Sequence, residues 1–195
     1  MNPASETLLV ALEFARTLER LGIAHLLGGS LASAMHGEAR ATLDADFAVH
    51  MTPEQAARLA GALQGDYHVQ TDALVEAAAL KSMSNVFRKH PFVKIDVHVR
   101  APAGHSLEEM RRARPVAIGD SSEAVIRIAT PEDVVLQKLR GFRSGDEVSD
   151  RQWRDVLGVL KRRAPSLDVE YMRKWALSLG VADLLERALV ESQVV

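Results

Sequence analysis

The 195-residue sequence contains no cysteine, so it can form neither a disulfide framework nor a zinc site built on thiolates. It has no apolar run of about eighteen residues, the length that a membrane-spanning helix needs. Its first residues lack the basic region and apolar core of a signal peptide. These absences exclude a disulfide-stabilised secreted scaffold, and they predict a cytoplasmic protein with no membrane partner.

An excess of positive charge is also missing, because 24 Lys and Arg stand against 26 Asp and Glu. This balance excludes a protein that coats nucleic acid along its whole surface. One segment differs from the rest, since residues 138–163 hold eight basic and four acidic side chains. Such a segment fits either a solvated helix face or a surface that holds a polyanion, which could be a triphosphate or RNA.

A glycine turn lies near the start of the chain. The apolar residues 23–27 lead into Gly28, Gly29 and Ser30, and a short Ala-rich stretch follows. This order predicts a strand, a turn and a helix. Glycines at such a turn let the backbone approach a ligand closely, and the first N–H groups of the helix are unpaired donors that suit a phosphate. We therefore predict that Gly29 and Ser30 bind the phosphates of a nucleotide.

Two aspartates, Asp44 and Asp46, follow the predicted helix at strand spacing. Residues i and i+2 of a strand point to the same side, so the two carboxylates share one face. The other face is left to apolar side chains, those of Leu43, Ala45, Phe47 and Val49. Adjacent carboxylates repel each other unless a cation lies between them, and hard oxygen ligands suit Mg²⁺ or Mn²⁺. Taken alone, the pair also fits a solvated strand face; next to a phosphate-binding turn it indicates a metal-complexed nucleotide.

A third carboxylate is predicted from a hairpin at residues 83–100. Its second arm, 92–100, alternates between apolar residues on one face and polar residues on the other, and Asp96 lies on the polar face. From this pattern alone, Asp96 is either an exposed strand residue or a functional carboxylate on the open face.

The last third of the chain reads as helices, so we predict a core at residues 1–129 and a helical subdomain, packed on it, at 130–195. Thr130 and Pro131 form a helix start, and Lys138 lies beside the apolar stripe of that helix. An ammonium group there either extends past the core to water or reaches into the cleft to meet a triphosphate. The terminal helices are expected to cover a sheet face or to form a contact in a homo-oligomer.

The motifs resemble a known signature. Gly29-Ser30, then Arg40-x-Thr42, then Asp44-x-Asp46 with a hydrophobic residue after it, is similar to the signature of the polymerase-beta-type nucleotidyltransferase superfamily. Within it, the chain most resembles small bacterial minimal nucleotidyltransferases and AbiEii-like toxins. The resemblance implies an α/β (α+β) fold, in which a mixed sheet is flanked by helices and followed by a helical subdomain.

The resemblance also implies the roles of the site residues. The catalytic residues, which are also the ligands of two Mg²⁺ or Mn²⁺ ions, would be Asp44, Asp46 and Asp96. The nucleotide would be bound by Gly29, Ser30, Arg40 and Lys138. An acidic residue in the next helix, Asp155, would orient Lys138. Arg40 could instead only pair with a neighbouring carboxylate.

The implied reaction moves a nucleoside monophosphate from a nucleoside triphosphate such as ATP to an acceptor hydroxyl and releases pyrophosphate. The acceptor stays open: it could be a small molecule such as an aminoglycoside, a transfer RNA, or a protein hydroxyl, as in a toxin with a cognate antitoxin. Two other classes are compatible with the motifs. One is a nucleotide- or partner-binding module that has lost transfer activity. The other, a phosphohydrolase with an aspartate nucleophile, fits less well because the glycine turn precedes the aspartates.

Overall fold

The computed structural model describes residues 3–38, 42–119 and 124–194, with no account of the side chains of residues 3–5. The chain divides into two compact units, and the first comprises residues 1–31 and 41–128. The second comprises residues 32–40 and 129–195. Helix α2, Gly29–His36, therefore begins in one unit and ends in the other. Within the described ranges, no helix combines the length and the apolar character that crossing a bilayer requires.

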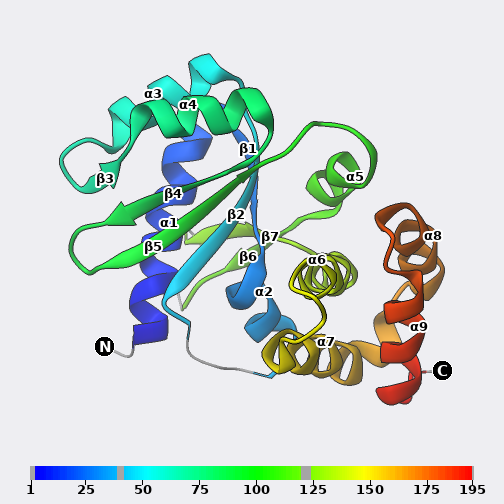
Figure 1. The fold of residues 1–195 in the computed structure, drawn as a ribbon. Helices are drawn as coiled ribbons and strands as arrows, with labels where there is room; N and C mark the ends of the chain where they lie inside the picture. The colour runs from blue at the N-terminus through cyan, green and yellow to red at the C-terminus, as the bar shows by residue number, and fades with distance from the viewer. Residues whose placement is uncertain (1–2, 39–41, 120–123, 195) are drawn as a thin grey trace. The chain divides into compact units, whose positions relative to one another are not determined.

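A mixed sheet forms the centre of the first unit (Figure 1). The described residues give it seven strands in the order β3-β4-β5-β2-β1-β7-β6. The strands are β1 Ala24–Leu27, β2 Asp44–His50, β3 Tyr67–Val69, β4 Met83–Arg88, β5 Val93–Val99, β6 Arg114–Ala117 and β7 Val125–Ile128. Strand β2 runs parallel to β5, and β1 runs parallel to β7, whereas the other neighbours are antiparallel. The mixed sheet predicted from the sequence is confirmed.

Helices supply the core of the first unit against one face of this sheet. They are α1 Pro3–Arg20, α3 Pro53–Leu63 and α4 Thr71–Leu80, whereas α5 Gly104–Arg112 contacts the opposite face, where the Ser106 hydroxyl lies 2.9 Å from His50 Nε2 of β2. Phe14 of α1 packs on Phe47 of β2 with ring centroids 5.1 Å apart, and both rings are fully buried. Burying each ring contributes about 2–3 kcal/mol. Leu43 was expected on this apolar face, but it precedes the strand and is 65% exposed.

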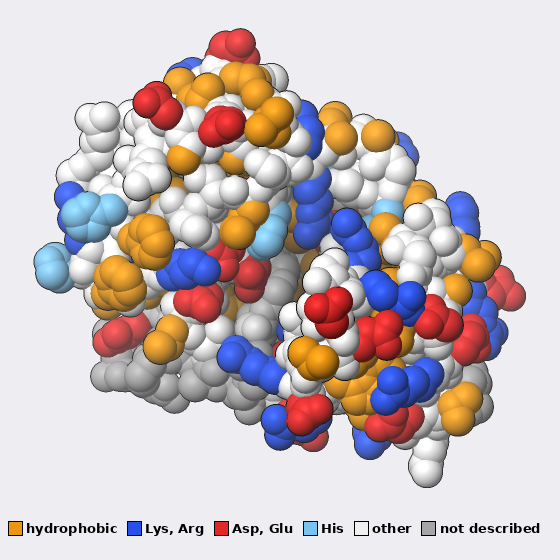
Figure 2. Space-filling model, viewed as in Figure 1, with side chains coloured by type: hydrophobic (Ala, Val, Ile, Leu, Met, Phe, Trp, Pro, Cys, Tyr) orange, Lys and Arg blue, Asp and Glu red, His pale blue; other side chains and the backbone are white. Residues whose placement is uncertain are grey.

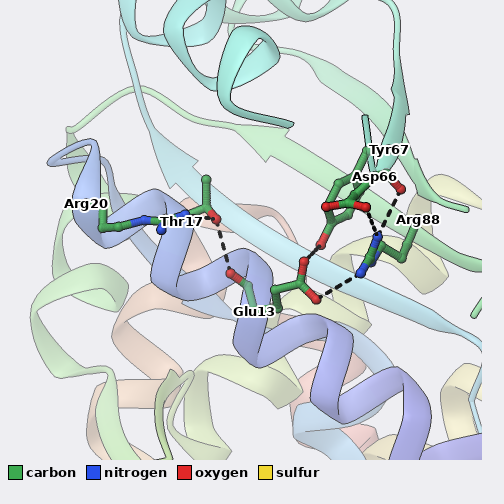
Figure 3. A network of polar contacts seen from close by, with 6 residues as sticks. All are labelled: Glu13, Thr17, Arg20, Asp66, Tyr67 and Arg88. Atoms are coloured by element: carbon green, nitrogen blue, oxygen red, sulfur yellow. Dashed lines mark hydrogen bonds and ion pairs between the residues drawn. The ribbon is translucent and has the colours of Figure 1, made fainter. Parts of the chain in front are cut away.

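A polar network joins α1 to the β3–β4 edge of the sheet (Figure 3). The Tyr67 hydroxyl donates to Glu13 at 3.2 Å, and Arg88 contacts Glu13 at 3.4 Å and Asp66 at 3.2 Å. Burial raises the pKa of the Tyr67 hydroxyl, so the group stays protonated and remains a donor. The Arg88 guanidinium also lies over the Tyr67 ring, 5.0 Å from its centroid. These contacts hold the edge strands against α1.

The second unit is helical. Besides the end of α2 it contains α6 Pro131–Ser144, α7 Asp150–Arg163, a short 3-10 helix Ala164–Ser166, α8 Val169–Leu179 and α9 Ala182–Glu191. The basic end of α7 caps the carboxyl end of α2: Arg163 donates to the carbonyl oxygens of Met35 and His36, and Arg162 donates to that of Gly37. Cations are favourable at this end of a helix dipole. Part of the basic segment at 138–163 is thus used inside the fold.

A buried histidine in the first unit predicts how stability depends on pH. His25 of β1 is 4% exposed, and its Nδ1 lies 3.0 Å from the Ile23 carbonyl oxygen. Burial lowers the pKa of His25 below the 6.5 of an exposed histidine, although the bond to Ile23 opposes the shift. As the pH falls through 6.5, the unfolded chain therefore takes up a proton before the folded chain does.

We expect the free energy of unfolding to decrease between about pH 8 and about pH 5, by up to about 1.4 kcal/mol per pH unit for this group. Urea denaturation across this range measures it. The variant His25→Gln should lose part of the pH dependence, and the same change at solvent-exposed His68 is the matched control. A His25→Gln protein with the slope of the wild type would contradict the burial argument.

Candidate active site

Two carboxylates lie side by side on the open face of the sheet. Strands β2 and β5 are parallel, and their register places Asp46 opposite Asp96 and Asp44 opposite Lys94. Register partners on adjacent strands point to the same side of a sheet. The Asp96 side chain is 13% exposed and that of Asp46 is 26% exposed, while Asp44 is exposed at the strand's start. The structure thus brings the three predicted aspartates to one face.

The glycine turn wraps around Asp46. Helix α2 begins at Gly29; the Gly28 N–H donates to the Asp46 carbonyl oxygen at 2.8 Å, and the Ser30 N–H donates to Asp46 Oδ2 at 3.4 Å. Gly29 has a φ of +55°, and a Cβ built on it would collide with the Asp46 carboxylate. Only glycine fits here without strain and without a clash. The amino end of α2, where a phosphate is predicted to bind, therefore adjoins the first of the paired carboxylates.

Lys94 is part of this cluster, although it was not among the predicted site residues. Its Nζ lies 2.9 Å from both carboxylate oxygens of Asp96. The hydrogen bond to Asp96 raises the pKa of Lys94, and the charges of Asp44 and Asp46 add to this effect, so the ammonium stays protonated. The strand alternation contained the signal, because Lys94 stands two residues before Asp96 and thus on the same face.

Two further polar side chains of this region take different positions. His98, opposite Ala48 in the register, has its Nε2 3.6 Å from Asp46 Oδ1 and lies on the carboxylate face. Arg100, which directly follows β5, donates instead to Glu109 of α5 at 2.6 Å. Glu109 is 2% exposed, so its ionised carboxylate requires such a partner. Arg100 thus serves the packing of α5, while His98 borders the candidate site.

The donor set of this face fits a hard divalent cation. Asp96 Oδ1 is buried, and neither the Lys94 ammonium, 2.9 Å away, nor another donor among the described residues satisfies it with hydrogen-bond geometry. Asp46 supplies further carboxylate oxygens from the neighbouring strand. The described part of the chain contains no gathered group of three His, Cys, Asp or Glu side chains. Mg²⁺ typically takes one or two carboxylates and completes its shell with substrate phosphates and water, and Asp46 and Asp96 are two such carboxylates on adjacent strands.

The remaining predicted nucleotide ligands lie elsewhere. Arg40 falls at residues 39–41, outside the described residues. Lys138 belongs to the second unit, where its Nζ donates to Asp155 Oδ2 at 2.7 Å, and the two side chains are 9% and 10% exposed. The predicted pairing of Lys138 with Asp155 is therefore present. That Lys138 binds a triphosphate stays a prediction.

No protein-family model matches the sequence, and no curated protein matches it. Several solved structures do match. An antigenic nucleotidyltransferase-like protein from Paracoccidioides brasiliensis is 16% identical, with a TM-score of 0.54 over 95% of this chain and 93% of that one. The antibiotic-resistance factor ANT(2'')-Ia is 13% identical, with a TM-score of 0.50 over 99% and 98%. JHP933 from Helicobacter pylori is 19% identical, with a TM-score of 0.49 over 97% and 87%.

Identities this low show a shared fold and no more. The first two likenesses extend over nearly the whole length of both partners, so the fold is common to the core and to the C-terminal helices. The α/β fold predicted from the sequence is thus confirmed as a nucleotidyltransferase-type fold. Membership of the AbiEii-like group stays a prediction.

Proposed function

We propose that this protein is a nucleotidyltransferase that moves a nucleoside monophosphate from a nucleoside triphosphate to an acceptor hydroxyl. The observation that carries the proposal is the joint placement of the amino end of α2 and the Asp46–Asp96 pair on one sheet face. The N–H groups at a helix amino end, placed beside paired carboxylates, suit a triphosphate with its cation. The shared fold supports the same reaction class, since one of the similar structures is a nucleotidyltransferase-like protein.

Each residue has a role in this reaction. The N–H groups at Gly29 and Ser30 would hold the phosphates, and the Asp96 carboxylate would accept the proton of the acceptor hydroxyl. The acceptor oxygen then bonds to the α-phosphorus, while the bond from that phosphorus to the bridging oxygen breaks and pyrophosphate leaves. Two Mg²⁺ or Mn²⁺ ions, held by Asp44, Asp46 and Asp96, would supply charge neutralisation for the triphosphate.

One observation favours a second candidate, a nucleotide-binding module without transfer activity. The Lys94 ammonium lies against both oxygens of Asp96, so it already neutralises the carboxylate that would serve as base or metal ligand. A protein that has lost transfer could keep such an ion pair in place of a metal. In the transferase, by contrast, Lys94 would turn toward the phosphates when substrate binds.

The test is incubation of the protein with each α-labelled triphosphate, Mg²⁺ or Mn²⁺, and an extract of RNA and protein. We expect label on one class of acceptor with the wild type. The variants Asp46→Asn and Asp96→Asn should lower the transfer rate about 10²- to 10⁴-fold, because a carboxylate that holds the metal or takes the proton is gone. The control variant Asp72→Asn changes an exposed aspartate of α4 and should transfer normally.

The two candidates predict different outcomes. Metal-dependent nucleotide binding without any labelled acceptor or free pyrophosphate would favour the binding module. Label that persists in Asp46→Asn and Asp96→Asn would instead remove these carboxylates from the mechanism.

A further inference from the structure

The open face of β4 carries exposed apolar side chains next to the candidate active site. Antiparallel pairing places Asn85 opposite Asp96, with Met83 and Phe87 on the same face of the same strand. Met83 is 49% exposed, and the half-buried Phe87 ring stacks on Phe92, with centroids 6.0 Å and planes 19° apart. Phe92 itself is 70% exposed. We call these three apolar side chains together with Asn85 the β4 platform.

Each end of the β4 platform has a nitrogen-bearing partner on β5. The register pairs Phe87 with Lys94 and Met83 with His98, on either side of the Asn85–Asp96 pair. Figure 2 shows the result, since hydrophobic, basic, acidic and histidine side chains gather on the surface over β4 and β5. Aromatic rings beside cationic and hydrogen-bonding groups form an arrangement that binds single-stranded nucleic acid, in which bases stack and phosphates meet positive charge.

We propose that the β4 platform binds the unpaired end of a single-stranded RNA and presents its terminal ribose hydroxyl to Asp96. The inference rests on the proposed transfer function and names its acceptor. Met83 and Phe87 are four residues apart on a strand, about 13 Å, so the platform accommodates more than one nucleobase. Asn85, midway along it, offers an amide that can hydrogen-bond a base edge.

The same surface disfavours the other acceptor classes. A polycationic aminoglycoside would find no carboxylate among the residues of the β4 platform, and the Lys94 ammonium, opposite Phe87, repels cations. A base-paired RNA end keeps its bases stacked on each other, so it cannot lay them on an aromatic ring. The exposed aromatic pair is therefore best used by unpaired bases.

The experiment is a binding titration of the full chain, without nucleotide or metal, against a short single-stranded RNA that carries a fluorophore at its 5′ end. We expect Phe92→Ser and Met83→Ser to raise the Kd about tenfold each at fixed low salt, because stacking surface is lost. The aromatic variant Phe92→Tyr should bind like the wild type. The matched control is Leu80→Ser, an equally exposed apolar residue of α4, at 68%.

Several outcomes would overturn the inference: no RNA binding by the wild type, equal binding by Phe92→Ser, or equal binding of a blunt duplex. Equal competition by adenosine monophosphate would make a free nucleotide the occupant and would also overturn it. In the labelled-triphosphate assay, transfer of label to a protein of the extract would also overturn the inference. Because the titration needs no triphosphate, it stays informative when transfer fails: RNA binding lost in Phe92→Ser, with no label on any acceptor, would support the platform and reject the transferase.

Discussion

Adding one methyl group at Gly29 should lower nucleotidyl transfer at least about a hundredfold, since displacing a catalytic group by about 1 Å can cost that much. The Cβ of alanine would overlap the Asp46 carboxylate and lie only 2.6 Å from Asp46 Cβ. The Asp46 side chain must then leave its place beside the Ser30 N–H. The labelled-triphosphate assay measures the loss directly.

A measurement of stability distinguishes the effect of this clash from the effect of backbone strain. Gly29 and Gly104 share a φ of +55°, but a Cβ at Gly104 would meet nothing within 4 Å. The variant Gly104→Ala should therefore show only the conformational cost, about 1 kcal/mol, and should transfer normally. Gly29→Ala should be less stable than this control in urea denaturation.

A second substitution tests whether the clash with the Asp46 side chain causes the loss of stability. In the Gly29→Ala background, Asp46→Gly removes every side-chain atom that the new methyl meets, including the Cβ at 2.6 Å, so it should recover stability without recovering transfer. Transfer by Gly29→Ala at the rate of the wild type would show that the turn does not need to hold Asp46 closely. Equal destabilisation by Gly29→Ala and Gly104→Ala would show that backbone strain is the whole effect.

The parts of this structure that were predictable from sequence are those that neighbouring residues determine. Thr130 and Pro131 predicted a helix start, and α6 begins there, with the Asp133 N–H donating to the Thr130 hydroxyl at 3.3 Å. The alternation of residues 93–99 likewise predicted a strand with one buried face, and β5 has this pattern. Both signals work because the interacting groups lie within a few residues of each other.

The pairing of segments that lie far apart in the sequence does not depend on neighbouring residues, so it could not be predicted from the sequence. That Asp46 lies opposite Asp96 depends on the parallel register of β2 and β5, which are separated by β3, β4 and two helices along the chain. A shift of one residue would turn one carboxylate to the buried face. A shift of β2 would move buried Phe47 out of the core, and a shift of β5 would do the same to Ile95, so both residues oppose it.

Side-chain partners were the second feature that could not be predicted from the sequence. Lys94 was read as one of the polar residues on an alternating strand, and its contact with both oxygens of Asp96 became visible only in three dimensions. The basic segment at 138–163 was read from its charge alone. Arg162 and Arg163 prove to donate to backbone carbonyls at the end of α2, an association across more than a hundred residues. Composition gives the charge of a segment but not its partners.

The buried pair of Lys138 and Asp155 should account for the largest stability effect in the second unit. The two side chains are about nine-tenths buried and 2.7 Å apart. Lys138→Met would leave the Asp155 carboxylate without its ammonium partner inside the unit, at a cost of about 3–5 kcal/mol. Urea denaturation measures the loss. The exposed pair of Arg173 and Glu186 is the control, and Arg173→Met should change stability far less because water screens that pair.

Removing both charges distinguishes the contribution of the ion pair to stability from that of apolar packing. The double variant Lys138→Met/Asp155→Leu should recover most of the stability that Lys138→Met loses, because neither charge of the pair remains buried. If the double variant is as unstable as Lys138→Met alone, the loss comes from the packing of the lysine stem rather than from removal of the ammonium beside the Asp155 carboxylate.

The same double variant tests the predicted role of Lys138 toward the triphosphate. An ion pair that only holds α6 against α7 can be replaced by apolar side chains without loss of transfer. An ammonium that also binds phosphate cannot be replaced, since methionine carries no charge to offer. A stable Lys138→Met/Asp155→Leu protein with transfer lowered at least about tenfold would thus assign Lys138 to the nucleotide, because charged hydrogen bonds contribute about 1.5–3 kcal/mol. Transfer at the wild-type rate would confine Lys138 to the fold of the second unit.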